Sequence, residues 1–416
     1  MAKFIIDGQN PISGEIVVLG AKNAAIKMMA ASILINGDVI LNNVPDILDI
    51  EKLSSILSKM GAKIIREGHR LKINCQNISN ANPDDNLVSS IRASVVLVGP
   101  ILAKYGKARI IHPGGDKIGK RPIDRHIKAF QDLGIKVTEK ENYYEFEKTN
   151  ILNNKVRFDK ISVTGTENIL LFASFQKQSI IIENAAIEPE IIDLIEFLKK
   201  AGVQINFSDR QITVTGKKDL IGLTHTVIPD RIEAGTFMVL AAASKSNLKI
   251  LNIVPEHLKE FLDKLTEIGV KFDIGRDFIY IEESRDLQAV DISTAEYPGL
   301  ATDLQPPLGV LLTQATGTSH IKENIFENRL AYLNELKLMG ANVKIINNQT
   351  AEISGPSNLV GKNIQSLDIR AGVTLIIAGL ISSGQTVIYE AENIDRGYEK
   401  IEKRLINLGA KIKRVE

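Results

Sequence analysis

The sequence predicts an α/β (α+β) protein with two domains, six repeats of about 70 residues, buried helices and outer sheets. Three observations predict this fold class. A helix followed by a glycine and a strand recurs six times, a second kind of helix is apolar on nearly every face, and the N-terminal segment has the pattern of a strand that the last repeat lacks. The 416 residues are enough for about two to three domains.

The recurring motif is an amphipathic helix that ends at glycine, as in KMGAKII and EIGVKFD. Apolar residues three and four apart precede the glycine, as in EPEIIDLIEFLKK, which is typical of a surface helix. Glycine is the usual residue just past a helix end. The six glycines are Gly61, Gly134, Gly202, Gly269, Gly340 and Gly409.

The second helix of each repeat is small and apolar all round, as in AAIKMMAASIL and GVTLIIAGLIS. A helix without a polar face is buried. Each repeat is therefore expected to run strand, buried helix, strand, amphipathic helix, strand, strand, with sheets wrapping the buried helices.

The N-terminal segment explains how the chain closes. The sixth repeat stops at AKIKRVE without its return strand, and FIIDGQNPISGEIVVLG near the N-terminus has that strand's pattern without a preceding helix. We therefore expect one domain of residues 22–229 and another of residues 1–21 plus 230–416, with three repeats each. Two crossings between domains predict a hinge, and clefts between domains commonly hold ligands.

Charge and composition argue against several classes of function. The 51 Lys and Arg against 50 Asp and Glu lack the excess of one sign expected of a nucleic-acid or membrane-surface protein, and no tryptophan is present to stack on bases. The single cysteine, Cys75, excludes an intrachain disulfide and a CxxC motif, which favours a reducing, cytoplasmic setting. The sequence shows neither a signal peptide nor an apolar run of about 18 residues, so no membrane association is expected.

Polar or charged residues are expected where the buried helices begin. Helix N-termini carry unpaired N–H groups and attract anions, so this pattern predicts a polyanion site. The alternative for each residue is that it caps its helix or forms an ion pair. The residues are Lys22 with Asn23, Arg92, Glu167 with Asn168, Arg231, Asp303 and Arg370.

A loop over residues 112–126, HPGGDKIGKRPIDRH, is the densest cluster of glycine and charge. Residues 114–120 match GxxxxGK, but Arg121 and Pro122 follow where a P-loop needs Ser or Thr, which excludes a nucleoside triphosphatase. We expect a phosphate-binding loop with Asp116 among its cations; the alternative is a solvated surface loop.

Asp303, in YPGLATDLQ, is a carboxylate predicted to face the polyanion site. A carboxylate would repel an anionic ligand, so a role as the base that takes a proton from a substrate hydroxyl explains Asp303 better than a role in binding. The alternative is that Asp303 is the N-cap of its own helix. Arg329 in IFENR and Arg396 in IDRGYE are further candidates, and each alone would be more typical of a surface arginine.

Ten motifs then carry a resemblance: GAKNAA (20–25), SSIRAS (89–94), PGGDKIGKRPIDRHI (113–127), DKISV (159–163), IENAAIEPEI (182–191), PDRIEAGT (229–236), YPGLATDLQ (297–305), IFENR (325–329), DIRAG (368–372) and IDRGYE (394–399). On these motifs the sequence resembles the enolpyruvyl transferases. The resemblance implies a two-domain inside-out α/β barrel. It also implies transfer of the enolpyruvyl group of phosphoenolpyruvate to the 3′-hydroxyl of UDP-N-acetylglucosamine, a step of peptidoglycan precursor synthesis that supports cell shape and division. It implies no metal or organic cofactor, and a monomer is favoured.

The resemblance also implies roles for single residues. Asp303 would take the proton of the sugar hydroxyl, and Asp116 would protonate the methylene carbon of phosphoenolpyruvate. The expected phosphoenolpyruvate ligands are Lys22, Asn23, Arg121 and Arg396. The expected UDP-N-acetylglucosamine ligands are Arg92, Arg121, Pro122, Ile123, Asp124, Arg125, Lys160, Ser162, Val163, Asp303 and Ile325.

Two residues depart from the family pattern. Most members have cysteine where this chain has Asp116, so the resemblance implies insensitivity to fosfomycin, which alkylates that cysteine, and an activity profile at lower pH. Many relatives have leucine where this chain has Arg125, which leaves open whether Arg125 adds a phosphate contact.

Three other functions are considered. A sibling enzyme that acts on shikimate 3-phosphate typically has Lys-Ser at the position of Lys22-Asn23 and lacks the loop motif. A non-catalytic regulatory paralogue would explain Asp116 but needs none of the other site residues together. An enzyme that processes nucleic-acid ends is disfavoured by the neutral charge balance.

Overall fold

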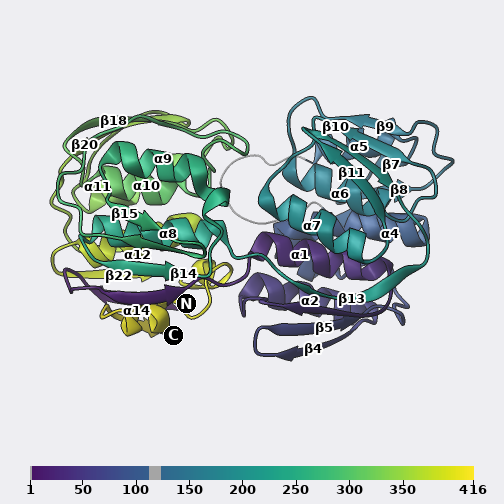
Figure 1. Ribbon diagram of the computed structural model, residues 1–416, viewed down its shortest axis with the longest axis horizontal. Coiled ribbons are helices and arrows are strands. Elements are labelled where there is room, and N and C mark those ends of the chain that lie inside the picture. The colour runs from purple at the N-terminus through teal and green to yellow at the C-terminus, as the bar shows by residue number, and fades with distance from the viewer. Residues whose placement is uncertain (1, 112–122) are drawn as a thin grey trace. The chain divides into compact units, whose positions relative to one another are not determined.

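The computed structural model describes residues 2–111 and 123–416, which form two compact units (Figure 1). The first unit holds residues 20–111 and 123–228, and the second holds residues 2–19 together with Pro229–Glu416. The expected boundaries, after residues 21 and 229, lie one or two residues from these. The loop residues 112–122, with Asp116, Arg121 and Pro122, lie outside the described residues.

The elements of the first unit follow the expected order except in the second repeat, where no described strand lies between β5 and the helical segments α3, η2 and α4. Its helices are α1 (Lys22–Ala31), η1 (Ser32–Leu34), α2 (Leu48–Met60), α3 (Asp85–Ser89), η2 (Arg92–Leu97), α4 (Val98–Tyr105), α5 (Asp124–Asp132), α6 (Val163–Ala173) and α7 (Pro189–Lys200). Its strands are β3 (Ile35–Asn42), β4 (Lys63–Glu67), β5 (Arg70–Asn74), β6 (Lys107–Ile111), β7 (Lys136–Glu139), β8 (Tyr143–Glu147), β9 (Lys155–Arg157), β10 (Ile180–Glu183), β11 (Gln204–Ser208), β12 (Gln211–Thr215) and β13 (Leu220–Thr226).

The second unit repeats this order. Its helices are α8 (Arg231–Ala243), η3 (Pro255–Leu258), α9 (Lys259–Ile268), α10 (Gln305–Leu312), η4 (Arg329–Ala331), α11 (Tyr332–Leu338), α12 (Ile369–Ile381), α13 (Glu392–Asp395) and α14 (Ile401–Asn407). Its strands are β1 (Lys3–Asp7), β2 (Gly14–Val17), β14 (Leu248–Leu251), β15 (Phe272–Ile274), β16 (Phe278–Ile281), β17 (Ile292–Ser293), β18 (Gly317–Lys322), β19 (Asn342–Asn347), β20 (Thr350–Gly355), β21 (Asn363–Gln365), β22 (Gln385–Tyr389) and β23 (Lys411–Val415).

The described strands form five four-stranded sheets and one three-stranded sheet, β6-β8-β7. In each four-stranded sheet one strand runs parallel to its neighbour and the other pairs are antiparallel, as in β9-β10-β12-β11. Alternate residues face inward: Ile182 of β10 lies between Val156 and Ile212, and all three are buried. This alternation gives each sheet one apolar face for the buried helices.

The buried helices form the core of each unit, which confirms the predicted fold class. Every residue of α10 is buried, and every residue of α12 except Ile381. Helices α8, α10 and α12 pack against one another inside the second unit, with strands such as β18 and β22 along its outside (Figure 1).

The six predicted glycines all end amphipathic helices. Each has φ between 89° and 113°, a left-handed conformation that glycine adopts without strain. The N–H of the next residue donates to the carbonyl five residues back, as from Ile135 to Phe130 at 3.0 Å and from Ala341 to Leu336 at 3.0 Å. This Schellman cap turns each helix into the following strand.

The N-terminal segment completes the second unit, as the repeat pattern predicted. Strand β1 lies between β22 and β23, with Phe4 opposite Ile388 and Arg414. Strand β2 runs parallel to β14, and β13 runs parallel to β3 in the first unit. The strand that precedes each unit's first buried helix in the chain therefore belongs to the other unit's sheet.

Two expected helix starts are wrong. Glu167 and Asn168 lie inside α6, because the Ser162 side chain caps that helix by accepting from the Gly165 N–H at 3.2 Å. Asp303 precedes α10, which begins at Gln305 because the two prolines that follow fit only the first turn of a helix. The starts at Lys22, Arg92 and Arg231 are confirmed, and Arg370 is the second residue of α12.

The cap at Gly340 gives a stability prediction. Gly340 has φ 98°, and a Cβ there would lie 3.4 Å from the Asn358 carbonyl oxygen, so the strain of Gly340→Ala is mainly conformational. We expect Gly340→Ala to lower the free energy of unfolding by about 1–2 kcal/mol in urea denaturation. Gly340→Asn is the control, because asparagine tolerates this conformation and loses less. Equal stability of wild type and Gly340→Ala would contradict the role of the cap.

Candidate functional site

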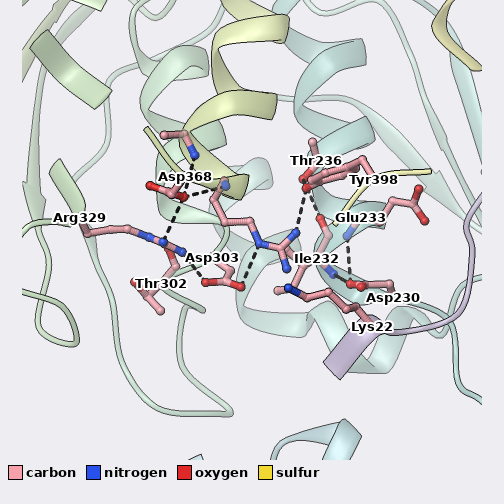
Figure 2. A network of polar contacts seen from close by, with 12 residues as sticks. Lys22, Asp230, Ile232, Glu233, Thr236, Thr302, Asp303, Arg329, Asp368 and Tyr398 are labelled. Atoms are coloured by element: carbon pink, nitrogen blue, oxygen red, sulfur yellow. Dashed lines mark hydrogen bonds and ion pairs between the residues drawn. The ribbon is translucent and has the colours of Figure 1, made fainter. Parts of the chain in front are cut away.

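In the second unit, Asp303 lies between two arginines (Figure 2). Its Oδ2 accepts from Arg370 Nε at 3.0 Å, and its Oδ1 accepts from Arg329 Nη2. The side chains of Arg329 and Arg370 are only 2% and 5% exposed, whereas that of Asp303 is 27% exposed. The cations thus contact the carboxylate from the protein interior while the carboxylate still reaches solvent. Such a group can accept a proton from a substrate hydroxyl.

Arg370 is held by a chain of buried hydroxyls. Its Nη1 donates to the Tyr398 hydroxyl at 3.1 Å, which lies 2.9 Å from Thr236 Oγ1. Thr236 in turn donates to the Ile232 carbonyl at 2.7 Å (Figure 2). Helices α8 and α12 are therefore tied together through the arginine that contacts Asp303.

The charge states in this network are fixed by their surroundings. Burial lowers the pKa of Arg370, but Tyr398, Asp303 and Asp230 together raise it, and the net pKa is above its ordinary value. Burial raises the pKa of Tyr398 against the opposing effect of Arg370. The guanidinium is therefore charged and the phenol neutral throughout the physiological pH range.

Asp368 and Asp230 cap the two helices of this network. Asp368 Oδ1 accepts from the N–H groups of Arg370 and Ala371 at 2.8 and 3.1 Å, and it lies 3.6 Å from Arg329 Nη1. Asp230 caps α8 by accepting from Ile232 N–H at 2.8 Å. Asp368 therefore both starts α12 and orients the second arginine on Asp303.

Buried Glu323 places the loop that holds the expected ligand Ile325. Its Oε1 accepts from the Ile325 N–H at 2.8 Å, and its Oε2 accepts from Thr302 Oγ1 at 3.0 Å. Thr302 adjoins Asp303, so one carboxylate positions both segments. Arg396 directly follows α13 and is half-buried, two residues before Tyr398.

In the first unit, Lys22 and Asn23 begin α1. The Lys22 ammonium lies 3.0 Å from Asp49 Oδ2 of α2, and no side chain at the N-cap Ala21 bonds the helix. The lysine is buried, while Asn23 is half-buried. A buried cation at a helix start whose N-cap side chain bonds no N–H group suits an anionic ligand.

The expected sugar-nucleotide ligands of the first unit stand at three helix starts. Arg92 is the first residue of η2, Asp124 and Arg125 are the first two of α5, and Ser162 with Val163 begins α6. Ile123 is buried, whereas the side chains of Asp124, Arg125 and Lys160 are exposed. Such helix starts can bind a diphosphate.

Arg125, the departure from the family pattern, is paired within the protein. Its Nε lies 3.5 Å from Asp159 Oδ1, just before Lys160. Backbone bonding from Lys160 lowers the pKa of Asp159, and the charge of Arg125 lowers it further. This pair joins the start of α5 to the segment that leads into α6.

Asp49, Asp368 and Tyr398 were not identified from the sequence. The last two stand in the motifs DIRAG and IDRGYE, but a motif does not reveal which arginine a side chain contacts. Asp116, Arg121 and Pro122 lie outside the described residues.

Across the described ranges, no group of three or more His, Cys, Asp or Glu could hold a metal ion, and no helix is long and apolar enough to cross a membrane.

Cys75 is not a candidate nucleophile. It is buried, and burial raises the pKa of its thiol to about 12. A thiol of this kind is not ionised at neutral pH, so it reacts poorly with electrophiles.

Comparisons with known proteins agree along the whole chain. The chain is 42% identical over 413 residues to UDP-N-acetylglucosamine 1-carboxyvinyltransferase 1 of Caldanaerobacter subterraneus subsp. tengcongensis, covering 99% of both chains. It is 41% identical over 420 residues to UDP-N-acetylglucosamine 1-carboxyvinyltransferase of Koribacter versatilis, covering 100% of this chain and 97% of the relative.

A solved structure shares the fold. The enolpyruvyl transferase NikO from Streptomyces tendae matches with a TM-score of 0.90 at 21% identity, covering 100% of this chain and 99% of that one. The model of the EPSP synthase family (3-phosphoshikimate 1-carboxyvinyltransferase) matches residues 6–405. With its sixfold repeat, its buried helices and these matches, the chain belongs to the EPSP synthase family of enolpyruvyl transferases.

Proposed function

We propose that this protein transfers the enolpyruvyl group of phosphoenolpyruvate to the 3′-hydroxyl of UDP-N-acetylglucosamine and releases phosphate. The observation that carries this proposal is the identity of 41–42% over nearly the full length to relatives named for that acceptor. The product feeds peptidoglycan precursor synthesis, and through it cell shape and division. We place the protein in the cytoplasm and favour a monomer.

The family model itself is named for a different acceptor, 3-phosphoshikimate. Two sequence features favour the sugar nucleotide. Asn23 follows Lys22 where the shikimate enzyme typically has serine, and the loop motif PGGDKIGKRP is present. We therefore keep 3-phosphoshikimate as the competing acceptor to be tested.

Asp303 acts as the base in the proposed reaction. The two arginines that contact it orient its carboxylate, and its partial exposure leaves it open to a hydroxyl. As the 3′-oxygen attacks the central carbon of phosphoenolpyruvate, Asp303 takes its proton.

Asp116 acts as the acid that protonates the methylene carbon, giving an oxocarbenium-like centre. The attack then forms a tetrahedral intermediate that carries a methyl group. Elimination breaks its C–O bond to phosphate, and the Asp116 carboxylate takes a proton back from the methyl group, which restores the C=C bond of the enolpyruvyl product. Lys22, Arg121 and Arg396 are proposed to neutralise that phosphate, and Asn23 is proposed as a further phosphoenolpyruvate ligand. Arg92, the segments at 121–125 and 160–163, Asp303 and Ile325 hold the sugar nucleotide.

The acceptor is tested by phosphate release from phosphoenolpyruvate with UDP-N-acetylglucosamine or shikimate 3-phosphate. We expect phosphate release with UDP-N-acetylglucosamine and none with shikimate 3-phosphate. Asp303→Asn is expected to lower turnover by about 10²- to 10⁴-fold while UDP-N-acetylglucosamine still binds, because the amide cannot accept the proton. Asp291→Asn, at an exposed aspartate paired with His320, is the control. Phosphate release with shikimate 3-phosphate and none with UDP-N-acetylglucosamine would overturn the proposed acceptor.

Fosfomycin gives a second test. With Asp116 in place of cysteine, and with the buried Cys75 thiol at a pKa of about 12, no reactive thiol is expected at the site. Wild-type activity is expected to persist through incubation with the drug, and Asp116→Cys is expected to become sensitive. Cys75→Ser, expected to behave as wild type, controls for the remaining thiol. Time-dependent loss of wild-type activity would contradict the prediction.

The pH dependence gives a third test. A general acid works only while protonated, and the ordinary pKa is about 3.9 for aspartate and about 8.5 for cysteine. Activity is therefore expected to decline at lower pH in the wild type than in Asp116→Cys, with kcat measured from pH 5 to 9. Superimposable profiles would exclude Asp116 as the proton donor.

A further inference from the structure

A buried polar cluster in the first unit joins His126 of α5 with Asn168 and Thr164 of α6. Asn168 Nδ2 lies 3.0 Å from His126 Nδ1, and His126 Nε2 lies 3.2 Å from Thr164 Oγ1. His126 is 5% exposed and Asn168 is fully buried. The proposed chemistry uses none of these three side chains.

The hydrogen bonds of Asn168 fix how its amide is oriented. Its Oδ1 accepts from the Gly99 N–H at 2.7 Å, and its Nδ2 donates to the Val95 carbonyl at 2.8 Å. The amide nitrogen therefore also donates to His126 Nδ1. A Cβ at Gly99 would lie 2.3 Å from the backbone carbonyl oxygen of Asn168, so α4 and α6 are in close contact there.

This orientation fixes the tautomer of His126. Because Nδ1 accepts, the proton of the neutral ring stands on Nε2 and is donated to Thr164 Oγ1. Burial, with the charge of Arg92 adding to it, lowers the pKa of His126 to about 3, so the ring stays neutral.

The cluster connects the three helix starts that carry the expected sugar-nucleotide ligands. His126 directly follows Arg125 on α5, and Thr164 directly follows Val163 on α6. Through Val95, Asn168 bonds η2, which begins at Arg92. The pair of Arg125 with Asp159 joins the same two segments on the exposed side.

We infer that His126, Asn168 and Thr164 are positioning residues that hold these three helix starts in register for the sugar nucleotide. The inference rests on the proposed function for the identity of the ligand. Because His126 and Asn168 are buried, they act through the helices and not by contact with the nucleotide. Loss of one hydrogen bond of the cluster is expected to weaken binding of the sugar nucleotide by about fivefold. Lys22 and Asn23, the expected phosphoenolpyruvate ligands on α1, have no part in the cluster, so binding of phosphoenolpyruvate is expected to change little.

The test measures the Kd of UDP-N-acetylglucosamine by calorimetry and the KM of phosphoenolpyruvate by kinetics. Thr164→Val, which keeps the shape but loses the hydroxyl, is expected to raise that Kd about fivefold and to change the KM of phosphoenolpyruvate by less than about twofold. Thr164→Ser is expected to restore the wild-type Kd. Thr213→Val, on strand β12, controls for the loss of a threonine hydroxyl elsewhere in the unit.

A double-mutant cycle separates positioning from direct contact. His126→Asn retains an acceptor for Asn168 but does not reach Thr164, so it is expected to weaken binding as Thr164→Val does. The double variant is then expected to be no weaker than either single variant. Additive losses would mean that Thr164 contacts the nucleotide directly, which would overturn the inference.

Two further outcomes are decisive. Nitrogen-15 NMR is expected to show His126 with its proton on Nε2, and the opposite tautomer would overturn the assigned bonds. An unchanged Kd in Thr164→Val, with a wild type that binds, would overturn the inference and leave the proposed function standing. A wild type that binds no UDP-N-acetylglucosamine would overturn the proposed function itself.

Discussion

The structure depends on helices that have no face suited to water. Since nearly all of α1, α6, α8, α10 and α12 is buried, each unit must wrap its central helices in sheet on all sides. Several polar residues stand at the ends of these helices, although others, such as Glu167 and Asn168 of α6, are buried inside them. Lys22, Arg92 and Ser162 stand at such ends in the first unit, and Asp230 and Asp368 in the second. A core of this kind therefore concentrates charged and capping residues at the helix ends, and the starts at Lys22 and Arg92, where no N-cap side chain bonds the helix, suit an anionic ligand.

In the second unit, two buried guanidinium groups, those of Arg329 and Arg370, contact the single carboxylate of Asp303. Arg329 and Arg370 would be costly to bury alone, and Asp303, Asp368 and Tyr398 offset that cost with hydrogen bonds. Because Asp303 is the most exposed member, its carboxylate is where this charged network reaches solvent. The same contacts that stabilise the arginines thus prepare a base with a fixed orientation.

The fold was predictable from the sequence because its signals are periodic. Six glycines that recur every 67 to 73 residues, each followed by a buried small or apolar residue, indicate the same Schellman cap six times. The site was predictable only in part. Asp303 and Arg370 were identified as candidates, but their mutual contact joins positions 67 residues apart and follows from tertiary packing. The starts of α6 and α10 were misplaced because the Ser162 cap and the prolines after Gln305 outweighed the expected polar starts.

Strand order also determines when each unit can form during synthesis. The first unit has all its described strands once β13 has left the ribosome, because β13 is the last strand of that unit and pairs with β3. Strands β1 and β2 are made first, yet β2 waits for β14, and β1 waits for β22 and β23 near the end of the sequence. At ordinary rates of translation that wait is on the order of tens of seconds. Of the described strands, β1 therefore remains unpaired the longest, and during that time its edges are open to chaperones and to wrong strand partners.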